Sequence, residues 1–98
     1  MILKLSCMTS KEFHICYRRA VSSMIRRMRG VYLVEHSERV SDKDLAAVLK
    51  VKPTTFSRLS RGCFSASPVV LLRLVDQLGV DVVFNILNTH HQEKQKQI

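Results

Sequence analysis

The sequence lacks the features that mark a membrane or secreted protein. No uninterrupted apolar run approaches the roughly 20 residues that a membrane-spanning helix needs. The apolar segment 1–7 is too short to be the core of a signal peptide. There is also no internal repeat and no low-complexity tract. We therefore expect one cytoplasmic, globular unit.

Residue clusters that bind metals or carry out catalysis are also missing. The cysteines Cys7, Cys16 and Cys63 show no CxxC spacing, and the four histidines are scattered. A structural zinc site needs tighter, repeated spacing, so we expect reduced thiols and no metal. We find no nucleophile–base pair, no paired carboxylates in an apolar setting and no phosphate-binding loop. The sequence therefore predicts neither an enzyme nor a cofactor.

Acidic residues are few, and the resulting net positive charge is distributed unevenly along the chain. Eight Asp and Glu face sixteen Lys and Arg, which gives a net charge of +8. Residues 1–30 contribute +6, residues 31–62 contribute +2, and residues 63–98 sum to zero. Such an excess favours a polyanionic partner, either a nucleic acid or an anionic membrane face. If DNA is the partner, the first two thirds must face it, and the neutral last third is free for packing or dimerisation.

The apolar residues that are present follow a helical period. The chain has 98 residues, of which 46% are hydrophobic and 24% charged, and this fits one small core. Apolar steps of three and four predict helix over residues 10–36, either as one helix or as two separated at Gly30. Shorter helices are expected over 42–50, 54–61 and 68–78, with Leu72 facing inward. Val80 is expected in the core and Asp81 as the cap of a last helix. No segment alternates long enough to demand a sheet, so we predict an all-α domain over 10–87 with tails at 1–9 and 88–98, the latter flexible.

The helix ends carry local signals. Ser41 and Ser67 are good N-caps, and Pro53 and Pro68 are tolerated at the first position of a helix, where the missing N–H would be unpaired. Gly62 is suited to closing a helix because it adopts positive φ easily. Together these signals bracket two short helices within residues 41–62, where Phe56 and Leu59 form an inward pair. This spacing is typical of a helix-turn-helix.

The stretch 41–62, SDKDLAAVLKVKPTTFSRLSRG, resembles the helix-turn-helix family of phage lambda-type repressors and Cro, also called the Xre family. The matching residues are, in order, Ser41, Leu45, Ala46, Leu49, Val51, Thr55, Ser57, Arg58, Leu59 and Gly62. The resemblance continues through Ser67-Pro68 and Leu78-Gly79-Val80, and covers roughly residues 31–84. The chain departs from the family pattern at several positions: the frequent glutamine is Asp42, the turn glycine is Lys50, the capping serine is Lys52, and the late glutamate is Ser60.

The resemblance implies a five-helix lambda repressor-like domain, here with an extended basic N-terminal helix. It implies that the second helix of the motif enters the major groove of double-stranded DNA. The residues it directs toward base edges are Lys52, Pro53, Thr54, Thr55 and Arg58. The residues better suited to phosphates are Lys43, Ser57, Ser60 and Arg61. The basic helix adds Arg18, Arg19, Arg26 and Arg29 as further candidates for backbone contacts.

Several interpretations remain open at this point. The leading one is a bacterial or phage-encoded transcriptional regulator, associated with the nucleoid, that reads a palindromic operator as a homodimer. Its dimer surface is expected in the neutral last third, with Val82, Phe84, Ile86 and Leu87 as candidates. The alternatives are an antitoxin that binds both its operator and a toxin, or a protein-interaction module without specific DNA reading. The basic helix 11–29 is interpreted as a DNA-contacting element, a partner-binding helix or a solvated face.

Overall fold

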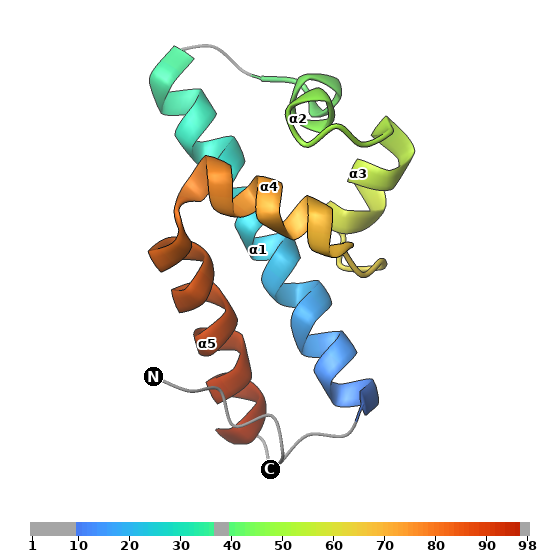
Figure 1. Cartoon of the computed structure of the whole chain (residues 1–98), viewed down its shortest axis with the longest axis vertical. Coiled ribbons are helices and arrows are strands. Elements are labelled where there is room, and N and C mark those ends of the chain that lie inside the picture. The colour runs from blue at the N-terminus through green and yellow to red at the C-terminus, as the bar shows by residue number, and fades with distance from the viewer. Residues whose placement is uncertain (1–9, 37–39, 97–98) are drawn as a thin grey trace.

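The computed structural model describes residues 10–36 and 40–96, and confirms the prediction of an all-α protein (Figure 1). It contains five helices and, within the described residues, no strand. They are α1 (Ser10–His36), α2 (Asp42–Val48), α3 (Pro53–Ser60), α4 (Pro68–Leu78) and α5 (Val80–Lys96). The tail expected at residues 1–9 lies outside the described residues.

α1 is a single helix of 27 residues, which makes it about 40 Å long at 1.5 Å per residue. Gly30 does not interrupt it. This glycine is exposed, and a Cβ atom added to it would meet nothing within 4 Å, so it lies on the solvent side, where no packing depends on it. The continuity comes from the opposite face. That face is buried at a helical spacing through Ala20, Val21, Met24, Ile25 and Met28.

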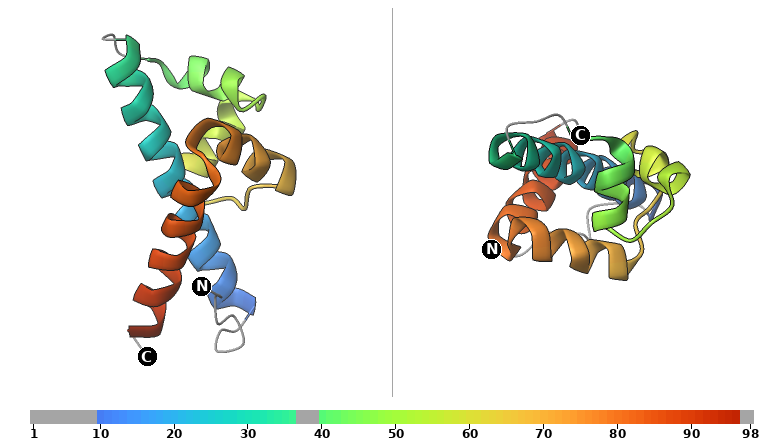
Figure 2. Two further views of the ribbon diagram at one scale, coloured as in Figure 1. Left: turned by 60° about the vertical axis from the view of Figure 1, so that its left-hand side comes forward. Right: turned by 90° about the horizontal axis from the view of Figure 1, so that it is seen from above.

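The other helices pack around α1. Figure 1 shows α5 running back along α1 in the opposite direction and α4 lying across the middle of α1, and in the left view of Figure 2 α5 crosses α1. α3 packs against α1, and α2 packs against α3. Each helix contributes to one buried cluster with α1 at its centre. Its members from the other helices include Leu45 and Leu49, Phe56 and Leu59, Val70 and Leu74, and Val83. Burial of these side chains is the main source of stability.

The predicted helix ends are confirmed. Ser41 accepts a hydrogen bond from the Asp44 N–H at 3.2 Å, and Ser67 accepts one from the Val70 N–H at 3.3 Å. Pro53 and Pro68 are the first residues of α3 and α4. Gly62 follows α3 with φ of 73°, a conformation that costs glycine little. These helix ends depend only on residues that are close together in the sequence, which explains why the sequence alone predicts them.

Four expectations about the last third are wrong. Val80 is 65% exposed and Leu72 is 67% exposed, so neither belongs to the core. α5 begins at Val80, directly after Gly79, and Asp81 lies in its first turn rather than at its cap. The polar stretch after Asn88 is helical as far as Lys96, and His91 is 4% exposed. The reason is tertiary: α5 packs against α1, and packing of this kind holds helical a sequence that has little apolar periodicity of its own.

Candidate nucleic-acid interface

α2 and α3 are short helices joined by a tight turn at residues 49–52. The chain leaves α2 through two backbone hydrogen bonds, from Lys50 N–H to the Ala47 carbonyl at 3.1 Å and from Val51 N–H to the Ala46 carbonyl at 3.0 Å. Ala46 is fully buried in α2, and α2 packs against α3. The turn therefore fixes how α3 projects from α2.

Lys50 adopts a left-handed conformation in this turn, with φ of 55°. It is the only residue other than glycine with positive φ in the part of the chain that the structure describes. For an L-residue this conformation costs roughly 1–2 kcal/mol, because Cβ approaches the following carbonyl oxygen. The turn requires a left-handed backbone conformation, which glycine adopts most easily, and in this chain an exposed lysine adopts it.

α3 has one buried face and one exposed face. Phe56 and Leu59 are fully buried, which confirms the predicted inward pair. Four of the five residues expected to meet base edges are exposed, and Thr55 is half-buried at the edge of that face. The exposed four are Lys52, Pro53, Thr54 and Arg58. Lys52 is the residue before the helix, and its side chain makes no capping hydrogen bond.

The residues expected to contact phosphates divide into two groups. Lys43 and Arg61 are exposed, and the Arg61 Nε also donates to the Ser57 carbonyl at 3.3 Å. Ser57 and Ser60 are half-buried, and the Ser60 hydroxyl donates its proton to the Ser57 carbonyl at 2.9 Å. A phosphate would have to displace that internal bond to receive a hydrogen bond from Ser60.

One face of α1 lies against α3, the loop that follows it and the start of α2. The Arg18 Nε donates to the Ser65 hydroxyl at 3.0 Å, and the Ser22 hydroxyl donates to the Ser60 carbonyl at 2.6 Å. Further along, Arg29 forms an ion pair with Asp42. Residues 18, 22 and 29 are four and seven residues apart, so they share one face of the helix.

The other arginines of α1 are exposed, and their positions follow from the same period. Arg19 and Arg26 are seven residues apart and border the face that carries Ser22 and Arg29. Arg27 lies nine residues from Arg18, about half a turn around the helix, and is therefore on the far side. Arg18, Arg19, Arg26 and Arg29 therefore lie within about 100° of one another around α1, and Arg27 lies outside this arginine face.

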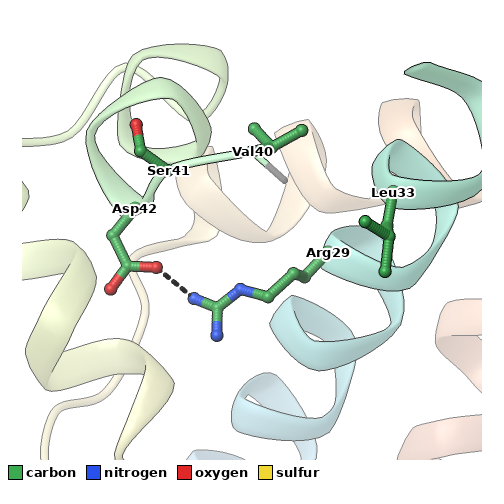
Figure 3. Close-up of a pocket in the computed structure, with 5 residues that line it drawn as sticks. All are labelled: Arg29, Leu33, Val40, Ser41 and Asp42. Atoms are coloured by element: carbon green, nitrogen blue, oxygen red, sulfur yellow. Dashed lines mark hydrogen bonds and ion pairs between the residues drawn. The ribbon is translucent and has the colours of Figure 1, made fainter. Parts of the chain in front are cut away.

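Figure 3 shows the contact between Arg29 and Asp42. The Arg29 side chain extends from α1 toward the carboxylate of Asp42, the first residue of α2. Leu33, Val40 and Ser41 line the same open pocket, whose volume is about 550 Å³. The sequence carries no signal of this pairing, because nothing local relates residue 29 to residue 42.

α4 makes a contact with the end of α2 that the sequence did not predict. The Arg73 Nη1 donates to the Leu49 carbonyl at 3.0 Å, so this arginine caps the C-terminal end of α2. A cation near the end of a helix is favourable for its carbonyls and its dipole. The sequence offers a basic residue in α4 but no signal of which helix end it reaches. Tyr32 of α1 donates to the Gln77 side chain at 2.8 Å and ties α4 to α1.

The residues expected at a dimer surface occupy different environments. Ile86 and Leu87 pack against the protein's own core, and Val82 is half-buried. Phe84 is 37% exposed. Within the described residues, Leu72 and Val80 are more exposed apolar side chains in the same third of the chain.

The described residues contain no group of three or more His, Cys, Asp or Glu that could hold a metal ion. None of their helices has both the length and the apolar character needed to cross a membrane. In comparisons with known proteins, no family model, curated protein or solved structure matches this chain significantly.

Proposed function

We propose that this chain is a transcriptional regulator of the repressor or Cro type, which reads a palindromic operator in double-stranded DNA as a homodimer. In this proposal α3 enters the major groove and α2 crosses the phosphate backbone. The observation that carries it is the division of α3 into two faces. Phe56 and Leu59 anchor the helix in the core, while Thr54 and Arg58 stand exposed on the opposite side.

The exposed face of α3 has the chemistry that base reading needs. The Arg58 guanidinium matches guanine O6 and N7 in a bidentate contact. Lys52 suits a guanine or a phosphate, and Pro53, Thr54 and Thr55 suit a thymine methyl group or a base edge. These side chains supply the specificity in the proposal.

The cations around α3 supply affinity that does not depend on sequence. Lys43 in α2 and Arg61 at the end of α3 are exposed, and so are Arg19 and Arg26 on α1. Contacts of this kind release counterions and make binding fall steeply with salt. They fix the register of the protein on the duplex without reading bases.

A second copy of the chain completes the proposed site. One small motif contacts only half of an operator, and two-fold pairing supplies the other half. Two chains of net charge +8 repel each other least where the charge is lowest. Residues 63–98 carry no net charge, and Leu72, Val80 and Phe84 there are exposed apolar side chains. We therefore assign the dimer contact to the exposed faces of α4 and α5.

The experiment that tests this function is a selection of bound fragments from random duplex DNA, repeated at two salt concentrations. We expect the same palindromic sequence to be recovered at both. Featureless binding that disappears at the higher salt concentration would mean that the arginines merely attract phosphate, and the proposal of specific reading would fail.

Three single substitutions separate base reading from charge. Arg58→Ala should cost roughly 1–3 kcal/mol of binding and relax one position of the recovered sequence. Arg26→Ala should weaken all sequences alike and lower the salt slope by about 1. Arg27→Ala is the matched control, because it removes the same charge from outside the arginine face and should change the slope less. An Arg58→Ala protein with unchanged affinity and site preference would rule out α3 as the reading helix.

A further inference from the structure

α4 and α5 are joined by a single residue, Gly79. α4 ends at Leu78 and α5 begins at Val80. Gly79 has φ of 91° and ψ of 149°, a combination that is open essentially to glycine alone. Figure 1 shows the two helices meeting at a sharp corner, which lies on the side of the molecule away from α3. The direction in which α5 leaves α4 therefore depends on the backbone torsions of one residue.

Gly79 already makes the backbone hydrogen bonds of a helical residue on both of its sides. Its N–H donates to the Val75 carbonyl at 2.7 Å, and its carbonyl accepts from the Val83 N–H at 3.2 Å. Both bonds join residues four apart, as in an α-helix. The N–H groups of residues 80–82 and the carbonyls of residues 76–78 have no partner within either helix, because they stand at the helix ends. A helix that ran through Gly79 would pair these three donors with these three acceptors.

A continuous helix would also bring the exposed apolar side chains of α4 into line with the buried face of α5. Val69, Leu72 and Val80 are 53%, 67% and 65% exposed. Val83 and Leu87 instead pack in the core. Counted at 100° per residue along one helix, all five lie within about 80° of one another. The full row, in steps of three and four, is Val69, Leu72, Asp76, Val80, Val83 and Leu87.

Asp76 is the charged member of this row, and Arg73 and Phe84 border it. Asp76 is exposed, and the Arg73 guanidinium donates to the Leu49 carbonyl of α2. The bend at Gly79 divides the row between two helices and leaves its first half in water. A straight helix would present the row as one stripe that a second copy can cover. The carboxylate weakens such a contact, but apolar residues remain on both sides of it.

α5 cannot stay on the α1 helix of its own chain if the corner straightens. On one continuous helix, the buried residues Val70 and Leu74 of α4 would lie about 140° around the axis from Val83 and Leu87 of α5. The two core faces would then point to different sides, and α1 would lose the helix that packs along it. The α5 helix of a second copy can restore those contacts, because it carries the same side chains.

We infer that two copies of this chain exchange α5: Gly79 becomes helical, α4 and α5 join into one helix over residues 68–96, and each α5 packs on the α1 helix of the other copy. This inference rests on the homodimer of the proposed function and specifies which element each copy receives. A very short connector invites such an exchange, because the native contacts are kept and only the connector changes. The corner lies away from α3, so the exchange leaves the exposed face of α3 free (Figure 1).

Cross-linking between α1 and α5 shows which chain supplies α5. Ser23 of α1 and His90 of α5 are hydrogen-bonded through their side chains at 2.9 Å. Ser23→Cys and His90→Cys are introduced together into the full chain with its native cysteines replaced by serine, and a short bismaleimide is added. In the exchanged dimer the link joins two chains, and a denaturing gel shows a covalent dimer. In a monomer, or in a dimer that pairs without exchange, the link closes within one chain.

Two changes at the connector test its role, with light scattering at several concentrations as the readout. Gly79→Ala should lower the dissociation constant of the dimer about tenfold or more, because alanine disfavours the bent conformation at both connectors. Insertion of Gly-Ser-Gly-Ser after Gly79 should make the protein monomeric, because a longer connector lets α5 fold back on its own chain. Gly30→Ala is the matched control. It replaces an exposed glycine in α1 that has open space around it, and it should leave the dissociation constant unchanged.

The outcomes separate this inference from the proposed function, because neither assay uses DNA. Links between chains, tighter pairing by Gly79→Ala and loss of pairing on insertion would support the exchange, even if the selection from random DNA recovers no sequence. A wild-type dimer whose links close within one chain, or whose pairing survives the insertion, would overturn the exchange and leave the homodimer standing. A wild type that stays monomeric at the highest concentration measured would overturn both the exchange and the homodimer. A Gly79→Ala protein that only melts at a lower temperature, without tighter pairing, would also overturn the exchange.

Discussion

Replacing Lys50 with glycine should make this protein more stable, although the change deletes a whole side chain. Lys50 adopts φ of 55° in the turn between α2 and α3 and is exposed, so it contributes no core packing. Its N–H donates to the Ala47 carbonyl, and glycine keeps that backbone bond. The substitution therefore relieves strain and removes no buried contact.

The magnitude follows from two opposing terms. The left-handed conformation costs a non-glycine residue roughly 1–2 kcal/mol, and glycine adopts it freely. Glycine also has more conformational freedom to lose on folding, which costs about 0.5–1 kcal/mol. The net gain is about 0.5–1 kcal/mol, which corresponds to a rise in Tm of about 2–8 °C for a domain of this size.

Thermal unfolding followed by circular dichroism, together with urea titration, measures this effect. Lys50→Ala controls for the lost charge, because alanine retains the strain and should give no comparable gain. Lys43→Gly is the opposite control. This lysine lies in the first turn of helix α2, where glycine should lower stability by up to about 1 kcal/mol. A Lys50→Gly protein no more stable than Lys50→Ala would refute the assignment of strain to this turn.

Two further substitutions test the packing of the core, and a third tests the stability of the protein at high pH. Phe56→Ala should lower the free energy of unfolding by about 3–5 kcal/mol, because the Phe56 ring of α3 is fully buried in the core. A variant with the wild-type Tm would contradict this. His91→Leu should raise the stability by about 1 kcal/mol, because both ring nitrogens of this buried histidine have no partner among the described residues; an unchanged or lower Tm would argue against it. Tyr17→Phe tests alkaline stability. Burial raises the pKa of the Tyr17 phenol above 10.0, so the folded state favours the neutral form. That contribution is complete below pH 10 and is lost as the pH rises through the higher folded-state pKa, so the wild type should lose Tm more steeply than Tyr17→Phe above about pH 10.

The sequence predicts the elements of this fold wherever a local rule decides them. Ser41, Pro53 and Gly62 mark the ends of α2 and α3 because capping, a missing N–H and positive φ concern only neighbouring residues. The place of Lys50 in the turn could also be predicted, since the family pattern that the sequence resembles has a glycine at this position. The inward pair of α3 followed from a spacing of three on a helix.

Local rules fail where a distant segment decides. The polar residues after Asn88 have no apolar period, yet they are helical because α5 packs along α1. Val80 looks like a core residue because it is apolar, but α5 begins directly after Gly79 and leaves it exposed. In the candidate interface, the partners of Arg29 and Arg73 depend on how α1 and α4 cross α2, which no spacing in the sequence encodes.

Those distant contacts explain how two such short helices can hold a fixed surface. α2 has seven residues and α3 has eight, and isolated helices shorter than about 12–15 residues are marginal in water. Arg29 of α1 reaches the start of α2, Arg73 of α4 caps its end, and Ser22 of α1 bonds the last residue of α3. Both ends of α2 and the last residue of α3 are thus tied to longer elements, while the exposed face of α3 is left for a ligand. The geometry of that face therefore depends on α1 and α4 as much as on the motif itself.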